Sequence, residues 1–100
     1  MKIEKRLLRS SIYLTLIGEL DTSTAEAVRD EMDNIDIDKA ERIVVDLSKL
    51  DFMDSTGIGV FLGRYKKFKE KNVQIFISSP KPNVDKILNL SGIYEIMPKI

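Results

Sequence analysis

One short stretch of the sequence holds the residue types that could carry chemistry, namely Asp54, Ser55, Thr56, Gly57 and Gly59. Ser55 stands where the N-cap of a following helix is expected, and its hydroxyl would there accept a hydrogen bond from an N–H of the first turn. A hydroxyl held on a tight turn between a strand and a helix is also a candidate phosphoacceptor. Phosphate would add about −1.5 to −2 charges at pH 7, and the positive end of the helix would partly stabilise that charge.

Three catalytic or nucleotide-binding motifs can be tested on the same stretch. A nucleophile elbow requires Gly-x-Ser-x-Gly, but Met53 takes the place of the first glycine and the chain has no histidine to activate Ser55. A dinucleotide-binding loop requires Gly-x-Gly-x-x-Gly, and Gly63 comes one residue too late. The spacing of Gly57 and Gly59 also fails the P-loop pattern. A phosphoacceptor therefore fits Ser55 better, and the alternative is a small nucleotide-binding domain that uses Ser55 and these two glycines at a helix N-terminus.

The composition narrows the function further. The 100 residues include no histidine and no cysteine, which excludes a Ser-His-Asp triad, a histidine-ligated zinc and a disulfide. No catalytic residue, metal or cofactor is therefore predicted, and a binding or regulatory module is favoured over an enzyme. No apolar run reaches the roughly 18–20 residues that span a bilayer, and residues 1–6 are too charged for a signal peptide. We expect a single domain over residues 1–100, located in the cytoplasm and without a membrane partner.

Charge is balanced over the whole chain but unevenly placed. Residues 19–41 carry nine acidic residues against two basic ones, a net charge of −7, and residues 64–71 carry five basic residues against one acidic residue, a net charge of +4. These segments are either solvated helix faces or a dipolar surface that orients a protein partner. The total charge of zero argues against nucleic acid as a partner.

Apolar periodicity predicts four strands and three helices. The strands are expected at about residues 3–8, 12–18, 42–47 and 73–77, the helices at about residues 24–35, 57–71 and 82–91, and residues 50–54 as a connector. The order β-β-α-β-α-β-α contains two crossover units, which favour parallel pairing, and an opening antiparallel hairpin. The prediction is an α/β fold with a mixed four-stranded sheet and helices packed on it.

The helices carry more specific predictions. Ser23 and Glu26 have the spacing of a capping box for the first helix. Gly59 and Gly63 are four residues apart on the second helix, so we expect close packing of this helix on the sheet, the alternative being a flat patch for a partner. Gly92 is expected to end the third helix. The apolar stripe of the second helix is expected to consist of Ile58, Phe61, Leu62, Tyr65 and Phe68.

Several segments together resemble the STAS-domain anti-sigma factor antagonists of bacteria. The Met-Asp-Ser-Thr-Gly-Ile-Gly-Val run at residues 53–60 is the most specific of them. The other matching segments are residues 18–21, 23–25, 43–47, 62–66 and 90–93. The resemblance therefore covers nearly the whole chain and implies a STAS-like fold.

The resemblance also implies a mechanism. In this family the unphosphorylated antagonist binds an anti-sigma factor that is also a serine kinase, and binding releases the sigma factor. The kinase phosphorylates the serine that corresponds to Ser55, and a serine phosphatase restores the active form. Asp54 and Asp21 would lie beside Ser55, and Thr56 with the first helical turn, including Gly57 and Gly59, would lie at the interface. A scaffold subunit that is never phosphorylated is the alternative within the same family.

One departure from the family concerns the end of the chain. Family members usually continue into another helix, whereas this sequence stops at Ile100. We therefore expect the final helix to be absent or cut off.

Overall fold

Strand β2 (Ser11–Leu20) is the element on which the sheet is built. In the computed structural model, which describes residues 1–100, β1 (Lys2–Leu8) pairs with β2 antiparallel, and β3 (Arg42–Asp46) pairs with it parallel. On the far side of β3 lies β5 (Gln74–Ser78), also parallel, so the order is β1-β2-β3-β5. The predicted α/β class with a mixed sheet is confirmed.

The sheet has a fifth strand that the sequence analysis missed. Residues 50–54 were expected to be a connector, but β4 (Leu50–Met53) pairs in parallel with the end of β2. This pairing exists because β2 continues beyond Gly18, where the strand was expected to stop. Gly18 has φ +120°, and the register of β2 against β4 shifts directly after it. The glycine therefore lets β2 turn from β3 toward β4 without ending.

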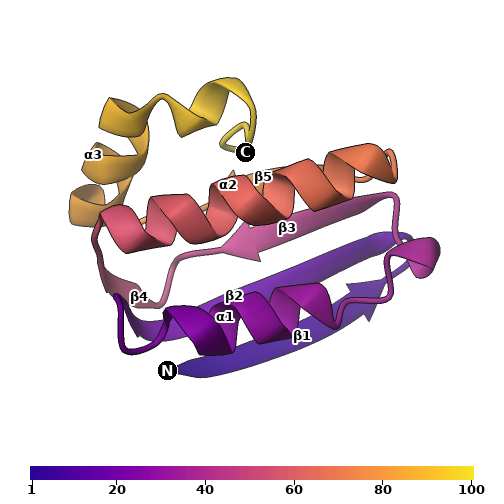
Figure 1. Ribbon diagram of the computed structural model, residues 1–100, viewed down its shortest axis with the longest axis horizontal. Helices are drawn as coiled ribbons and strands as arrows, with labels where there is room; N and C mark the ends of the chain where they lie inside the picture. The colour runs from indigo at the N-terminus through magenta and orange to yellow at the C-terminus, as the bar shows by residue number, and fades with distance from the viewer.

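The helices cover one face of the sheet. Figure 1 shows α1 (Ala25–Asp33) and α2 (Ser55–Glu70) side by side in front of the strands, with α3 (Pro82–Ser91) at the end of the sheet where β4 lies. Two short 3₁₀ helices, Ile37–Lys39 and Ile93–Glu95, complete the elements. Pro82 begins α3 and Gly92, with φ +77°, ends it, as predicted. None of the helices combines the length and the hydropathy that a membrane-spanning helix requires.

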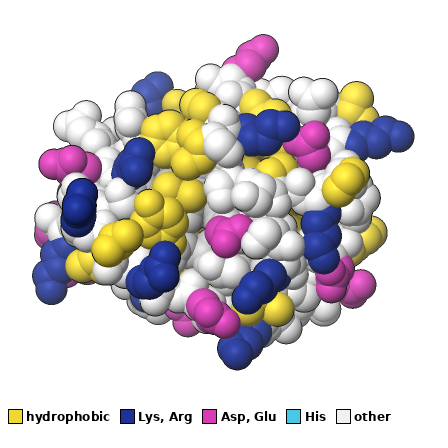
Figure 2. Space-filling model, turned by 180° about the vertical axis from the view of Figure 1, so that it is seen from behind, with side chains coloured by type: hydrophobic (Ala, Val, Ile, Leu, Met, Phe, Trp, Pro, Cys, Tyr) yellow, Lys and Arg dark blue, Asp and Glu magenta, His cyan; other side chains and the backbone are white.

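The core lies between this helical layer and the sheet. Alternation along the strands turns one set of side chains toward the helices, so that Leu14, Val45 and Ile77 are fully buried. The helices contribute Val28 and Phe61, which are also fully buried. The opposite face of the sheet has no helix on it, and Figure 2 shows a band of hydrophobic side chains there, with lysine and arginine side chains around it.

The buried stripe of α2 agrees with the predicted one at all but one position. The buried residues are Gly57, Val60, Phe61 and Phe68, whereas Leu62 is 38% exposed. Arg64 takes a position on the inner side of the helix, where its side chain is only 16% exposed and its Nε lies 3.2 Å from Asp33 Oδ1 on α1. Ile58 and Tyr65 are half-buried against the core, so the predicted stripe is confirmed except at Leu62, which is exposed.

Candidate functional site

The site is built where β2 and β4 end beside each other. Leu20 is the register partner of Met53, and the Asp54 N–H donates to the Leu20 carbonyl at 3.4 Å. Asp21 and Asp54 each follow directly on one of these two strands. The family resemblance implied that both aspartates lie beside Ser55, and the two strand ends do meet in the structure.

Asp54, and not Ser55, is the N-cap of α2. Its Oδ1 accepts a hydrogen bond from the Thr56 N–H at 2.9 Å, and its carbonyl accepts one from the Gly57 N–H at 3.0 Å. The expected cap at Ser55 is therefore wrong by one residue. An aspartate caps a helix about as well as a serine, so Asp54, which precedes Ser55, can serve as the N-cap in its place.

Ser55 consequently does not cap the helix. It is the first residue of α2, it is exposed, and its hydroxyl makes no hydrogen bond within the chain. The backbone on both sides is fixed, since Asp54 pairs with Leu20 and Thr56 with Asp54. The structure thus presents a hydroxyl without a partner on a braced turn at the positive end of a 16-residue helix.

Asp21 has a different local role. Its Oδ1 accepts from the Ser23 hydroxyl at 2.6 Å and from the Ser23 N–H at 2.9 Å, and these two bonds hold the pKa of the Asp21 carboxyl below its usual value. The hydroxyl of Thr24 donates to the Glu19 carbonyl at 2.7 Å and accepts from the Asp21 N–H at 3.0 Å. The predicted capping box of Ser23 and Glu26 is wrong, because Ser23 bonds to Asp21 and Thr24 becomes the N-cap without a side-chain bond to the helix.

The two glycines of the run have opposite surroundings. A Cβ at Gly57 would lie 2.6 Å from Met53 Sδ and 3.0 Å from Leu20 Cδ2, so the absent side chain lets the first turn of α2 sit directly on the strand ends. A Cβ at Gly59 or at Gly63 would meet nothing within 4 Å. The expected close packing at Gly59 and Gly63 is therefore wrong, and the alternative of a flat surface is the one that fits.

Two exposed apolar side chains lie near Ser55 in the sequence, and neither was predicted to belong to the site. Leu62 is 38% exposed and Phe52 is 42% exposed. Ser55, Gly59 and Leu62 follow one another at i, i+4 and i+7, which places them along one outward side of α2. Phe52 could have been found by treating residues 50–53 as a strand, because Met53 beside it is buried and alternation then turns Phe52 outward.

The first turn of α2 offers little to a nucleotide. The N–H groups of Thr56 and Gly57 are already bonded to Asp54, and Gly57 is buried. Gly59 lies inside the helix and not in a loop. Neither glycine therefore forms the flexible loop that cradles phosphates in nucleotide-binding motifs.

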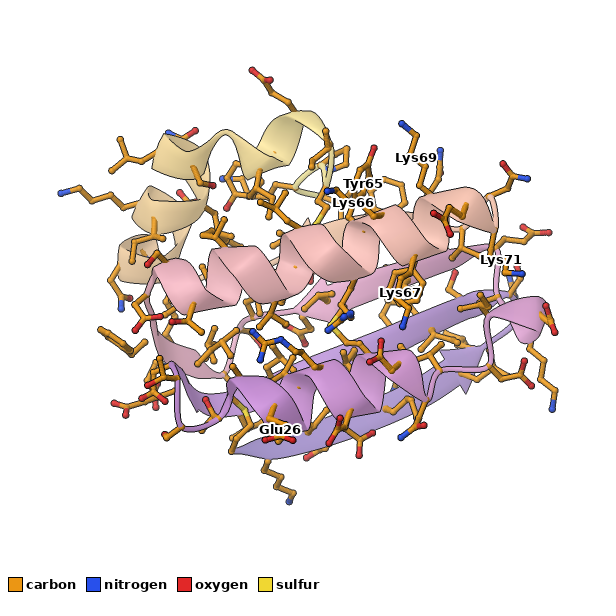
Figure 3. The ribbon with its side chains drawn as sticks, viewed as in Figure 1. Glu26, Tyr65, Lys66, Lys67, Lys69 and Lys71 are labelled. Atoms are coloured by element: carbon orange, nitrogen blue, oxygen red, sulfur yellow. The ribbon has the colours of Figure 1, made fainter.

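The acidic and basic segments partly neutralise each other. Asp33 Oδ1 on α1 lies 2.9 Å from Lys67 Nζ and 3.2 Å from Arg64 Nε on α2, and Lys5 Nζ lies 3.7 Å from Glu31 Oε2. In Figure 3, Lys67 lies on the side of α2 that faces α1. The charge asymmetry seen in the sequence therefore serves in part to join α1 to α2.

Comparison with known proteins gives a consistent result. The family model described as STAS domain matches residues 2–100. An anti-sigma F factor antagonist from Paenibacillus polymyxa is 40% identical over 99 residues, which are 98% of this chain and 85% of that protein. An anti-sigma-B factor antagonist from Listeria monocytogenes is 24% identical over 86 residues, covering 86% of this chain and 75% of that protein.

Solved structures agree with these sequence matches. The anti-sigma factor antagonist SpoIIAA in its unphosphorylated form superimposes with a TM-score of 0.83 at 26% identity, over 99% of this chain and 88% of that one. The Bacillus cell fate determinant SpoIIAA in its phosphorylated form superimposes with a TM-score of 0.74 at 26% identity, over 99% and 91% of the two chains.

Proposed function

Because this chain belongs to the STAS domain family, we propose that it is an anti-sigma factor antagonist whose binding to an anti-sigma factor is switched by phosphorylation of Ser55. Its similarity to anti-sigma factor antagonists over nearly its whole length supports the first part. The second part is supported by one observation above all: Ser55 is exposed and free of hydrogen bonds while the residues on both sides of it are fixed.

The anti-sigma factor is proposed to act as the serine kinase. The Ser55 Oγ would attack the γ-phosphorus of ATP, the bond from that phosphorus to the β-γ bridging oxygen would break, and ADP would leave as the hydroxyl proton passed to a base. A serine phosphatase would return the hydroxyl by transferring the phosphoryl group to water. Both enzymes belong to the partners, so this chain acts as their substrate and as a binding protein, without catalysis of its own.

Phosphate at Ser55 would change the surface without changing the fold. Ser55 makes no bond that the modification could break, and the helix dipole favours the added charge. Unit charges of like sign about 4 Å apart repel by about 1 kcal/mol in water. A dianion added beside Asp54 therefore opposes any acidic or apolar partner surface that fits over Ser55.

The proposed binding surface consists of Asp54, Ser55, Thr56, Gly57 and Gly59, with Asp21 beside it. Asp54 caps the helix and Asp21 organises the neighbouring turn, so both hold the surface in shape. Thr56 and the open side of Gly59 would contact the partner directly. We place the protein in the cytoplasm, where a sigma factor and its regulators act.

Intact-mass measurement after incubation with the anti-sigma factor kinase, ATP and magnesium tests this proposal. We expect one added phosphate on the unaltered protein and none on Ser55→Ala. The matched control is Thr56→Val, which removes the adjacent hydroxyl. It keeps the backbone N–H of residue 56, which donates to Asp54 Oδ1. Undiminished labelling of Ser55→Ala would remove Ser55 from the proposed role.

A further inference from the structure

A groove of about 370 Å³ runs along the outer edge of β5, at the opposite end of α2 from Ser55. Its walls come from the second half of α2 and from the C-terminal segment, and its floor is the edge strand itself. Tyr65 and Lys69 lie ten and fourteen residues after Ser55, which along a helix is about 15–20 Å. The residues that line it include Tyr65, Lys69, Ile75, Phe76, Ile96 and Pro98.

The backbone on the floor of this groove is unpaired on its outer side. In β5, Gln74 N–H donates to Glu41 and the Ser78 carbonyl accepts from Leu47, so the alternation turns Gln74, Phe76 and Ser78 toward β3. Ile75 and Ile77 therefore point their N–H and C=O groups outward. Those of Ile77 are used, but no backbone or side-chain group of the chain bonds to those of Ile75.

The chain itself shows what this edge can hold. The Ile77 N–H donates to the Pro98 carbonyl at 3.0 Å, and the Ile100 N–H donates to the Ile77 carbonyl at 2.9 Å, so Lys99 forms a parallel bridge with Ile77. An extended segment thus already pairs with the second half of β5. The first half, at Ile75, offers the same pair of backbone groups to another segment.

The charges beside the groove indicate the chemistry of that segment. Lys66, Lys69 and Lys71 are exposed and make no ion pair, whereas Lys67 is paired with Asp33. Figure 3 shows Tyr65, Lys66 and Lys69 on the side of α2 that faces the C-terminal segment. The helix side of the groove is therefore basic. Phe76 is half-buried and, by alternation with the buried Ile75 and Ile77, lies on the other face of the sheet, so that side is apolar.

We propose that this groove binds an extended segment of a partner protein, which adds as a strand to β5 at Ile75 and alternates acidic with apolar side chains. The acidic side chains reach Lys69 and its neighbours on the helix side. The apolar side chains lie beside Phe76 on the opposite face. Main-chain bonds to Ile75 provide affinity and the alternation provides selectivity. This second site does not depend on Ser55.

A short fluorescein-labelled peptide of alternating glutamate and valine is the probe, titrated by anisotropy against the full chain. We expect saturable binding, and at least about tenfold weaker binding of a matched peptide of alternating lysine and valine. Lys69→Glu should weaken binding of the glutamate peptide by at least about tenfold. Lys86→Glu is the matched control, because Lys86 is exposed, makes no ion pair and lies on α3, away from the groove. It should bind like the unaltered protein.

Amide hydrogen exchange identifies the mode of binding. Strand addition predicts that the Ile75 N–H becomes protected when the glutamate peptide is bound, and that Ser55→Asp shows the same protection. Binding without protection at Ile75, equal binding of the two peptides, full affinity in Lys69→Glu, or no saturable binding would each overturn the proposal. None of these outcomes bears on phosphorylation of Ser55, so the two proposals fail separately.

Discussion

The turns that follow β2 and β4 share one backbone hydrogen-bonding pattern, but their serine hydroxyl groups differ in whether they are bonded. In each turn an aspartate Oδ1 accepts from the N–H two residues later, Asp21 from Ser23 and Asp54 from Thr56, both at 2.9 Å. In the first turn the Ser23 hydroxyl also bonds to Asp21, at 2.6 Å. In the second turn the Ser55 hydroxyl bonds to nothing. Two adjacent turns of similar geometry therefore contain one serine whose hydroxyl is used for structure and one whose hydroxyl has no partner.

The largest expected effect concerns charge on these two serines. Ser55→Asp should weaken binding to the anti-sigma factor by at least about tenfold, or about 1.4 kcal/mol, because it places an added carboxylate on the proposed surface. Ser23→Asp should change this affinity much less, and the melting temperature of Ser55→Asp should stay close to that of the unaltered protein. Calorimetric titration measures the affinities. Equal loss of affinity in both variants would break the distinction between the turns.

Removing the cap of α2 should have the next largest effect. Asp54→Ala loses the bond to the Thr56 N–H and should lower the free energy of unfolding by about 1 kcal/mol, within a range of roughly 0.5–2. Asp54→Ser should restore most of this loss, since serine caps a helix as well. Urea unfolding followed by circular dichroism gives both values. An unchanged stability in Asp54→Ala would mean that Asp54 does not brace the turn.

The glycines of α2 give a third, smaller contrast. Gly59→Ala should raise the free energy of unfolding by about 0.8–1 kcal/mol, because its Cβ meets nothing within 4 Å and alanine favours a helix interior. Gly57→Ala should lack this gain, since its Cβ would lie 2.6 Å from Met53 Sδ. The same unfolding experiment compares the two variants. A similar gain at both positions would contradict the close seating of the first turn on the strand ends.

The smallest expected effect is a dependence on pH that belongs to the first turn. The hydrogen bonds from Ser23 lower the pKa of Asp21 from its usual 3.8. The stability that they contribute is therefore fully present above about pH 4 and is lost as the pH falls through the lower, folded-state pKa. As the pH is lowered from 5 to below the folded-state pKa of Asp21, the free energy of unfolding should fall less in Asp21→Asn than in the unaltered protein. Asp30→Asn, on the exposed side of α1, is the control and should follow the unaltered protein.

Much of the fold could be predicted from the sequence because it depends on local patterns. Alternation in β2, helical spacing in α1 and the glycine at position 92 are each visible within a few residues. Strand β4 was missed because it has only four residues and pairs only where β2 continues beyond Gly18. The half-buried place of Arg64 was not predicted, because its partner Asp33 is distant in the sequence.

The candidate site likewise has some features that could be predicted from the sequence and others that could not. The run around Ser55 could be singled out, since a hydroxyl between a strand and a helix is a local feature. That Asp54 caps the helix while Ser55 stays free depends on a competition between neighbouring side chains, which spacing does not decide. The open surroundings of Gly59 and the exposure of Leu62 depend on the exact rotation of α2 against the sheet, which only packing fixes.

The short parallel bridge between Ile77 and Lys99 has a consequence for the solubility of the protein. Sheets with unprotected edge strands tend to pair edge to edge with their neighbours in concentrated solution. Here residues 98–100 cover part of the exposed edge of β5. Removing residues 98–100 would uncover the backbone of Ile77 next to that of Ile75, and the shortened protein would be expected to self-associate.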